Sequence, residues 1–260
     1  MKSIELFAGG GGLLLGSSLA GFHHLAAAEW NKWATATLRN NISDGYPLIQ
    51  GLEVIEGDVR SINWNQFNKH EIDLVSGGPP CQPFSMGGKA KADNDPRDMF
   101  PAMTAAVADL KPRAFIVENV KGLTRAAFTD YFSFIKLRLN YPMVRARQGE
   151  SWLEHYKRLK QVDNTGGAQD LEYDVVTTIV NAADYGVPQH RHRVFMVGFR
   201  SDIETGWSFP EPTHSGTALQ QTQISGEYWE RHKTPQRDQV VLQRPGKGNP
   251  NLCLLYTSDA

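Results

Sequence analysis

Residues 3–20 read SIELFAGGGGLLLGSSLA, and this stretch sets the expected architecture of the chain. Ser3–Phe7 is a short apolar strand signal, Ala8–Gly12 is a glycine turn, and Leu13–Ala20 reads as a helix. A strand, a glycine loop and a helix in this order open a nucleotide-binding α/β sheet. The glycines do not fit the dinucleotide fingerprint G-x-G-x-x-G, because leucines occupy the third-glycine positions.

The same alternation continues along the chain. Further strands are predicted over His24–Glu29, Leu52–Glu56, Ile72–Ser76, Ala114–Val117, Tyr173–Val180 and Arg193–Phe199, and helices over Asn31–Asn40, Met99–Leu110 and Thr129–Leu139. Strands that alternate with helices predict an α/β fold with a doubly wound, mostly parallel sheet. Tyr141–Asp170 is polar and is expected to be irregular, as an insertion or long loop. After Trp207 the pattern fades into a polar, proline-punctuated stretch.

Composition sets broad limits on the class of protein. The chain has 260 residues, of which 40% are hydrophobic and 21% charged, as in an ordinary globular protein. The formal net charge of −1 does not indicate nucleic-acid binding, although a local basic face is sufficient for phosphate contacts. We see no signal peptide and no apolar run that approaches a membrane span, and we expect no metal site.

Two cysteines, Cys81 and Cys253, are too few for a disulfide framework and favour a reducing, cytoplasmic setting. Cys253–Ala260 reads CLLYTSDA, which looks like the translation of a transposon-adapter end used in sequencing libraries. We expect these residues to be a non-native tail; a natural apolar C-terminal strand is the alternative.

Polar residues recur just after predicted strands. Gly9–Gly12, Glu29, Asp58, Cys81 and Glu118 all occupy such positions. In open α/β sheets the ligand crevice lies outside the carboxyl ends of the strands. These residues are therefore expected to converge on one edge of the sheet.

Glu29 and Asp58, with the glycine loop, describe a nucleoside site without a dedicated phosphate cradle. A carboxylate after the second strand often accepts hydrogen bonds from ribose hydroxyls, and Asp58 can accept one from an adenine amino group. Helix capping or a solvated loop charge remains the alternative for either residue alone. A site of this kind suits S-adenosylmethionine, which has adenosine but no phosphates.

Cys81 lies in Gly77–Ser85, which reads GGPPCQPFS. Prolines on both sides hold the thiol in a stiff loop, because proline removes the backbone donors that a central strand needs. A free thiol has a pKa of about 8.5, so a nucleophilic role requires a basic neighbour or oriented amides. An inert, packed cysteine is the alternative.

Two further groups complete the candidate site. Glu118 can act as an acid, a base or a hydrogen-bond partner near a thiol, or merely cap a helix. Arg191 and Arg193 point to the same face of an extended segment, where two guanidiniums can grip phosphates or stabilise negative charge. An exposed basic strand end is the alternative.

Together these motifs resemble the DNA cytosine C5-methyltransferases. The resemblance rests on ELFAGGGG (Glu5–Gly12), EW (Glu29–Trp30), GD (Gly57–Asp58), GGPPCQPFS (Gly77–Ser85), ENV (Glu118–Val120), YGVPQHRHRVFMVG (Tyr185–Gly198) and FPEPTHS (Phe209–Ser215). It covers the chain from Ser3 to about Ser215. The proline-cysteine and QxRxR segments are specific as a pair, whereas the glycine loop is much less so.

The resemblance implies the Rossmann-like fold of S-adenosylmethionine-dependent methyltransferases and a role for each matching residue. Cys81 is the implied nucleophile, with Glu118 and Arg193 assisting at the cytosine ring and Arg191 nearby. The implied cofactor-binding residues are Phe7, Ala8, Gly9, Gly10, Gly11, Gly12, Leu13, Glu29, Trp30, Asp58, Val59, Pro80 and Met99. Gln82, Ser85 and Arg97 are candidate DNA contacts.

The implied reaction explains these residue types. Cytosine C5 is a poor nucleophile, and attack of the Cys81 thiolate on C6 makes C5 electron-rich. Glu118 would stabilise the adduct at N3. The cytosine must leave the base stack of double-stranded DNA to react.

Departures from the family pattern bear on domain organisation. Two late motifs, one in the target-recognition region and one that packs back on the cofactor site, are not found. We therefore expect a catalytic domain at 1–200 with an insertion at about 141–170, the truncated start of a target-recognition region at 201–252, and the non-native tail at 253–260. Such a chain is expected to be weakly active or inactive.

The resemblance further implies a monomer in a prokaryotic or phage setting, with a possible cognate restriction endonuclease. Alternatives stay open: a tRNA cytosine-5 methyltransferase of the same fold, or a catalytically silent DNA- or nucleotide-binding module. A nicotinamide dehydrogenase is disfavoured by the broken glycine register.

Overall fold

The computed structural model describes residues 1–67, 70–80, 98–167, 170–236 and 239. The chain divides into two compact units, and each is described by itself. The first comprises Met1–Thr178 and Val194–Trp207; the second comprises Ile179–Arg193 and the chain from Ser208 onward. The second unit thus includes Ile179–Arg193, the tip of the hairpin. This tip lies before residue 200, where the sequence analysis expected the catalytic domain to end.

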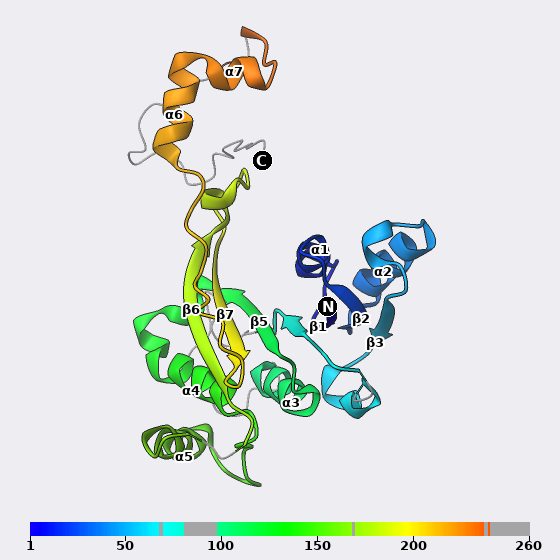
Figure 1. The fold of residues 1–260 in the computed structure, drawn as a ribbon, viewed down its shortest axis with the longest axis vertical. Helices are drawn as coiled ribbons and strands as arrows, with labels where there is room; N and C mark the ends of the chain where they lie inside the picture. The colour runs from blue at the N-terminus through cyan, green and yellow to red at the C-terminus, as the bar shows by residue number, and fades with distance from the viewer. Residues whose placement is uncertain (68–69, 81–97, 168–169, 237–238, 240–260) are drawn as a thin grey trace. The chain divides into compact units, whose positions relative to one another are not determined.

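A seven-stranded sheet runs through the fold in the order β3-β2-β1-β4-β5-β7-β6 (Figure 1). The strands are β1 (Lys2–Leu6), β2 (His23–Glu29), β3 (Glu53–Glu56), β4 (Leu74–Gly77), β5 (Ala114–Val120), β6 (Tyr173–Asn181) and β7 (His192–Arg200). The pairs β1–β2, β1–β4, β2–β3 and β4–β5 are parallel. The prediction of a mostly parallel α/β sheet is confirmed, and the predicted strands lie within three residues of the observed bounds at each end.

Helices follow the strands in the first unit. They are α1 (Gly12–Leu19), α2 (Lys32–Ser43), α3 (Phe100–Leu110), α4 (Thr129–Asn140) and α5 (Trp152–Asn164), with short 3₁₀ turns at Pro47–Ile49, Val59–Ser61, Trp64–Phe67, Lys121–Thr124 and Ala126–Phe128. Among the described residues, no helix is long and apolar enough to cross a membrane.

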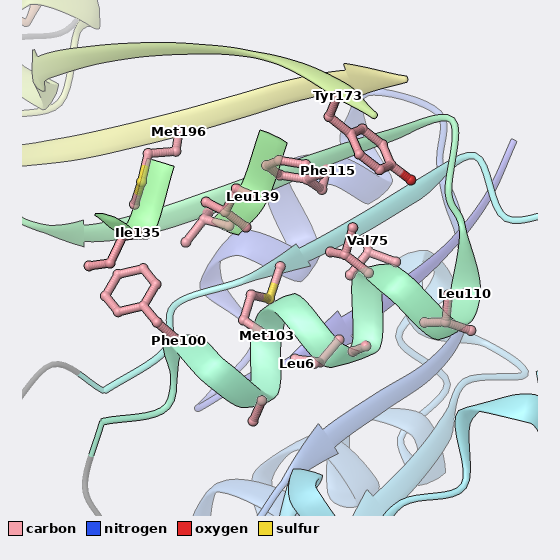
Figure 2. Packing of buried hydrophobic residues seen from close by; sticks show 14 of the residues in the cluster. Leu6, Val75, Phe100, Met103, Leu110, Phe115, Ile135, Leu139, Tyr173 and Met196 are labelled. Atoms are coloured by element: carbon pink, nitrogen blue, oxygen red, sulfur yellow. The ribbon is translucent and has the colours of Figure 1, made fainter. Parts of the chain in front are cut away.

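Alternate residues of β2 belong to two different hydrophobic cores, one on each face of the sheet. Ala26 and Ala28 belong to the larger core, whereas Ala27 packs with Leu14 and Leu38 of α1 and α2. Successive side chains of a strand point to opposite faces, so each face needs its own cover. Figure 2 shows the larger core, with Phe100 and Met103 of α3 facing the strands.

The turn after β1 depends on left-handed backbone. Phe7, Gly9 and Gly11 have φ of 55°, 54° and 90°. A Cβ at Gly11 would approach Leu38 Cδ2 to 2.9 Å, closer than side chains normally pack. Glycine is favoured there because it adopts positive φ without a steric penalty. Phe7 adopts the same region at a cost, and such strained residues cluster at functional sites.

Glu5 of β1 is a buried carboxyl group next to this turn. It is 1% exposed, accepts a hydrogen bond from Leu14 N at 3.0 Å, and accepts another from Ser76 Oγ at 2.8 Å. It thereby joins β1 to the first turn of α1 and to β4. Burial raises the pKa of Glu5 to about 7, against the lowering effect of its two hydrogen bonds.

The neighbouring strands β5 and β7 meet through a glycine and an aromatic ring. The ring of Phe115 occupies the space that a Cβ of Gly198 would need. Phe115 is fully buried, and its ring centroid lies 5.1 Å from that of Tyr173 in β6. Gly198 therefore leaves the room that the ring of Phe115 occupies next to the β7 backbone.

The expectation of irregular structure over Tyr141–Asp170 is wrong for residues 152–164, which form α5. A capping box begins the helix: Ser151 Oγ accepts from Glu154 N, and Ser151 N donates to Glu154 Oε2 at 2.9 Å. On its inner side Trp152 packs edge-on against Tyr131 of α4, with ring centroids 5.4 Å apart. Tertiary packing thus stabilises a helix whose sequence is mostly polar.

The second unit also contains regular structure where the sequence pattern fades. Its helices are α6 (Gly216–Ser225) and α7 (Glu227–Arg231), and the 3₁₀ turn Ala182–Tyr185 lies in its hairpin tip. Ala183 of that tip, Leu219 and Tyr228 form a small buried cluster. The polar, proline-punctuated stretch is therefore helical in part.

Candidate functional site

A cavity of about 410 Å³ opens in the first unit at the carboxyl ends of the parallel strands. Its lining residues are Phe7, Ala28, Glu29, Trp30, Gly57, Asp58, Val59, Arg60, Gly78, Pro80 and Met99. Ala28 and Glu29 end β2, and the others follow β1, β2, β3 or β4 or precede α3. Because β1 lies between β2 and β4, the cavity is at the point where the strand order reverses, the usual place for a ligand in such sheets.

Glu29 is the buried carboxylate of this cavity, with an exposed fraction of 8%. One oxygen accepts from Gly9 N and the other from Asn31 N, each at 2.8 Å. A carboxylate offers about four lone-pair sites, so each oxygen keeps acceptor capacity for a ligand hydroxyl. The contact with Gly9 also joins the glycine loop to the cavity wall.

Asp58 forms an ion pair inside the cavity that the sequence analysis did not predict. Its carboxylate accepts from Arg60 N at 2.9 Å and from Arg60 Nε at 3.0 Å, and Arg60 Nη2 lies 2.5 Å from Oδ2. Hydrogen bonds from Arg60 hold the pKa of Asp58 below its ordinary value. The sequence did contain a signal for this pair, because a cationic residue follows Asp58 two positions later in the same turn.

Apolar side chains form the rest of the lining. Phe7 projects from its left-handed backbone, and Trp30 is 73% exposed. Pro80 and Met99 are joined by a backbone hydrogen bond from Met99 N to Pro80 O at 3.3 Å. A cavity of this volume with aromatic walls and few polar groups is typical of a small-molecule site.

The structure does not bring every predicted cofactor residue into this lining. Ala8, Gly9, Gly10, Gly11, Gly12 and Leu13 are absent from it. Residues 8–11 form the adjoining turn, and Gly12 and Leu13 begin α1. In the turn, Ala8 N donates to Ala28 O at 3.2 Å and Gly11 N donates to Ala8 O at 2.9 Å. The turn is thus anchored to β2 next to the cavity.

Glu118 and Asn119 hold the backbone that leads to Cys81. An ideal Cβ at Gly78 would lie 3.2 Å from Glu118 Oε2, so this carboxylate rests directly against the loop. Asn119, which is 5% exposed, donates from Nδ2 to Pro79 O at 2.9 Å. Asn119 was not predicted as a site residue; its place directly after Glu118 was the only signal.

Cys81, Gln82, Ser85 and Arg97 lie outside the described residues. The last residue described before them is Pro80, which lines the cavity. In the described ranges, no group of three or more His, Cys, Asp or Glu side chains is placed to hold a metal ion.

Arg191 and Arg193 belong to the second unit. Arg191 is exposed, whereas Arg193 is half-buried and donates from Nη1 to His192 O at 2.9 Å. The guanidinium of Arg191 has no hydrogen bond or ion pair within the ranges that the structure describes. An exposed cation on an ordered strand end is suited to an anionic partner.

Comparisons with known proteins agree on one family. The profile described as "C-5 cytosine-specific DNA methylase" matches residues 1–141 and 153–246. The type II methyltransferase M.AquIA of Picosynechococcus sp. is 35% identical over 90% of this chain and 86% of that protein. The type II methyltransferase M.NgoPII of Neisseria gonorrhoeae is 36% identical over 81% of this chain and 51% of that protein.

A solved structure shows the same fold. It is described as a DNA modification methyltransferase encoded within a prophage of E. coli, with a TM-score of 0.55 and 26% identity over 80% of this chain and 49% of that one. The chain thus spans most of the first relative, but only about half the length of M.NgoPII and of this structure.

Proposed function

The chain belongs to the C-5 cytosine-specific DNA methylase family, and from this premise we propose that it transfers a methyl group from S-adenosylmethionine to C5 of cytosine in double-stranded DNA. The observation that carries the proposal is the cavity at the strand-order reversal. It combines a buried carboxylate with apolar walls, and Pro80 in its lining directly precedes Cys81.

The cavity fits the chemistry of this cofactor. Glu29 has acceptor capacity for the ribose hydroxyls, and Asp58 with Val59 would meet the adenine. Phe7, Trp30, Pro80 and Met99 supply apolar surface, and the turn Ala8–Leu13 would hold the methionine part. When bound, S-adenosylmethionine supplies an electrophilic methyl group.

The residues of this chain perform the covalent part of the proposed reaction. The Cys81 thiolate adds to cytosine C6, which breaks the aromaticity of the ring and makes C5 nucleophilic. A proton or hydrogen bond from Glu118 at N3 stabilises the negative charge of the adduct. After C5 has been methylated and has lost its proton, the Cys81–C6 bond breaks and the thiolate leaves.

The position of Glu118 supports this assignment. Its carboxylate rests against Gly78, and its neighbour Asn119 holds Pro79, so the acid and the loop that leads to Cys81 are joined. Arg193 would assist at the cytosine ring with Arg191 nearby.

A base inside a duplex is out of reach of this site, so the cytosine must be flipped out, at a cost of a few kcal/mol. We assign Gln82, Ser85 and Arg97 as DNA contacts of the flipped state. We further propose residues 1–200 as the catalytic domain and 201–252 as part of the target-recognition region, with 253–260 as a non-native tail. The proposed setting is the cytoplasm of a prokaryote, as a monomer, beside a cognate restriction endonuclease.

A trapping assay tests the proposal. A duplex with 5-fluorocytosine and S-adenosylmethionine is incubated with this chain. Fluorine takes the place of the C5 proton and cannot be removed as that proton is. Release of the thiolate is therefore blocked, and a working enzyme stays covalently attached to the DNA. We expect an adduct that disappears in Cys81→Ser and persists in Cys253→Ser, which makes the same change at the other cysteine.

The other outcomes separate the alternatives. An adduct that forms only with tRNA indicates an RNA methyltransferase. Cofactor binding without any adduct, across varied DNA and RNA, indicates a catalytically silent module. An adduct that survives in Cys81→Ser contradicts the assigned nucleophile.

A further inference from the structure

The carboxamide of Asn181, at the end of β6, makes four hydrogen bonds within the second unit. Its Oδ1 accepts from Ala183 N at 3.4 Å and from Arg191 N at 3.1 Å. Its Nδ2 donates to Asp184 Oδ1 at 3.2 Å and to His190 Nδ1 at 3.3 Å. Two backbone N–H donors fix which end of the amide is oxygen, and the full capacity of the group is used.

These bonds close the hairpin tip around one residue. Arg191 donates its N–H to the Asn181 side chain, and its carbonyl oxygen accepts from Ala182 N at 3.0 Å. Both backbone polar groups of Arg191 are therefore held by the opposite end of the tip. The direction in which its exposed side chain leaves the backbone is set by residues 181 and 182.

The tip is also anchored to Phe209–Ser215, the segment that carries the FPEPTHS motif. The carbonyl oxygen of Asp184 accepts from Thr213 N and from His214 N, each at 3.0 Å. Tyr185 Oη donates to Pro210 O at 2.8 Å. The tip is thus held on one side by the Asn181 carboxamide and on the other by this segment.

The two hydrogen bonds donated by Asn181 Nδ2 have no part in capping the 3₁₀ turn. Asp, Ser or Thr would cap the 3₁₀ turn Ala182–Tyr185 equally well through a side-chain oxygen. Only a carboxamide can also donate to Asp184 and His190. The extra bonds order the tip, and ordering a binding residue in advance lowers the entropic cost of association.

We propose that Asn181, supported by Asp184, is a positioning residue that fixes the backbone of Arg191 so that its guanidinium meets the nucleic-acid substrate. This inference rests on the proposed function and adds to it a residue that does not touch the reacting atoms. Substrate affinity and the rate of methyl transfer should therefore depend on Asn181, whereas cofactor affinity should not.

Three variants test the proposal. Asn181→Asp keeps the acceptor for Arg191 N, removes both donors and sets a second carboxylate against Asp184. The exchange Asn181→Asp with Asp184→Asn restores a side-chain bond between positions 181 and 184 with its direction reversed, and keeps the net charge. Asn164→Asp makes the same chemical change at an exposed position at the end of α5.

We expect Asn181→Asp to raise KM for DNA or lower the single-turnover rate by about tenfold, the effect of losing hydrogen bonds around a charged group. The Kd for S-adenosylmethionine should change less than about twofold. The exchange variant should recover most of the loss, and Asn164→Asp should match the wild type. A merely structural role would not give this separation of substrate from cofactor.

The proposal is overturned if Asn181→Asp behaves as Asn164→Asp, or if the exchange variant recovers nothing. If the wild type methylates no nucleic acid, KM and rates cannot be compared, and hydrogen exchange at the amides of Arg191 and Thr213 decides this inference independently of the proposed function. Faster exchange in Asn181→Asp with recovery in the exchange variant supports the positioning; unchanged exchange refutes it.

Discussion

At the scale of single residues, Glu29 links the glycine turn to the cavity. Its two oxygens accept from Gly9 N and Asn31 N, and the group still faces the cavity. A ligand that donates hydroxyl groups to it gains charge-assisted hydrogen bonds, each stronger than a neutral bond. The charge of Glu29 should therefore dominate cofactor affinity.

We predict that Glu29→Gln weakens the binding of S-adenosylmethionine by about 1.5 to 3 kcal/mol, the usual range for a hydrogen bond to a charged group. Titration of tryptophan fluorescence measures this, because Trp30 lines the cavity. Glu53→Gln, at an exposed position of β3, is the matched control and should bind as the wild type does. Equal affinity in both variants would remove Glu29 from the site.

Glu5 predicts how stability depends on pH. Burial raises its pKa from 4.5 to about 7, so the folded protein binds this proton more tightly than the unfolded chain does. The contribution of protonated Glu5 to the free energy of unfolding is present in full below pH 4.5 and is lost as the pH rises through about 7.

We predict that Glu5→Gln removes the part of the pH-dependent fall in stability that comes from Glu5. The free energy of unfolding of the variant, minus that of the wild type, should increase by about 1 kcal/mol per pH unit between those two values. Urea unfolding at pH 5, 6, 7 and 8 measures the difference, with Glu53→Gln as control. A difference that does not vary with pH would show that Glu5 is ionised at no cost in the fold.

Single residues also mark the limit of sequence reasoning about the site. Glu29 and Asp58 were found because each follows a strand, and parallel strands deliver such positions to one edge. Arg60 and Asn119 were missed, since their roles depend on which atoms they reach in the folded chain. Asn181 was missed because its partners include residues on both sides of the hairpin tip.

At the scale of elements, strands and helices of the sheet were predictable because a local pattern and the parallel topology favour the same structure. The helix α5 was not, although Ser151 and Glu154 spell the capping-box pattern in the sequence. Its buried side chains, including Tyr156 and Leu159, are interspersed with many polar residues. The packing partners in α4 could not be inferred from that segment alone.

We predict that Ser151→Ala lowers the free energy of unfolding by about 1 kcal/mol, because the cap satisfies backbone donors that the helix itself leaves open. The midpoint of urea unfolding should fall while its slope stays constant. Ser201→Ala, in an exposed turn, is the control and should leave the midpoint unchanged. A similar loss in both variants would mean that the cap of α5 does not stabilise the fold.

At the scale of the molecule, every described residue that lines the cavity belongs to the first unit. The described contacts of the proposed cofactor therefore lie in the first unit, whereas Arg191 and Arg193 belong to the second. Ligand binding stabilises the folded state by an amount that grows with its concentration above Kd, about 2.7 kcal/mol at a hundredfold excess.

We predict that S-adenosylmethionine slows amide hydrogen exchange in the turn after β1 and around Glu29 and Val59, and leaves α6 and α7 unchanged. Exchange followed by mass spectrometry, with and without cofactor, measures this, and adenosine alone should reproduce part of the effect. Protection confined to the second unit would place the cofactor elsewhere.

The contact between Gly198 and Phe115 has a consequence for protein engineering. Since the ring fills the space of a Cβ, positions 198 and 115 form a coupled pair in any saturation library. Larger residues at 198 should be recovered only in clones that also carry a smaller side chain at 115. By contrast, a Cβ at Gly10 meets nothing within 4 Å, so that position should accept changes independently of its neighbours. A selection for folded variants would thus reveal this strand pairing as covariation, without any further structure determination.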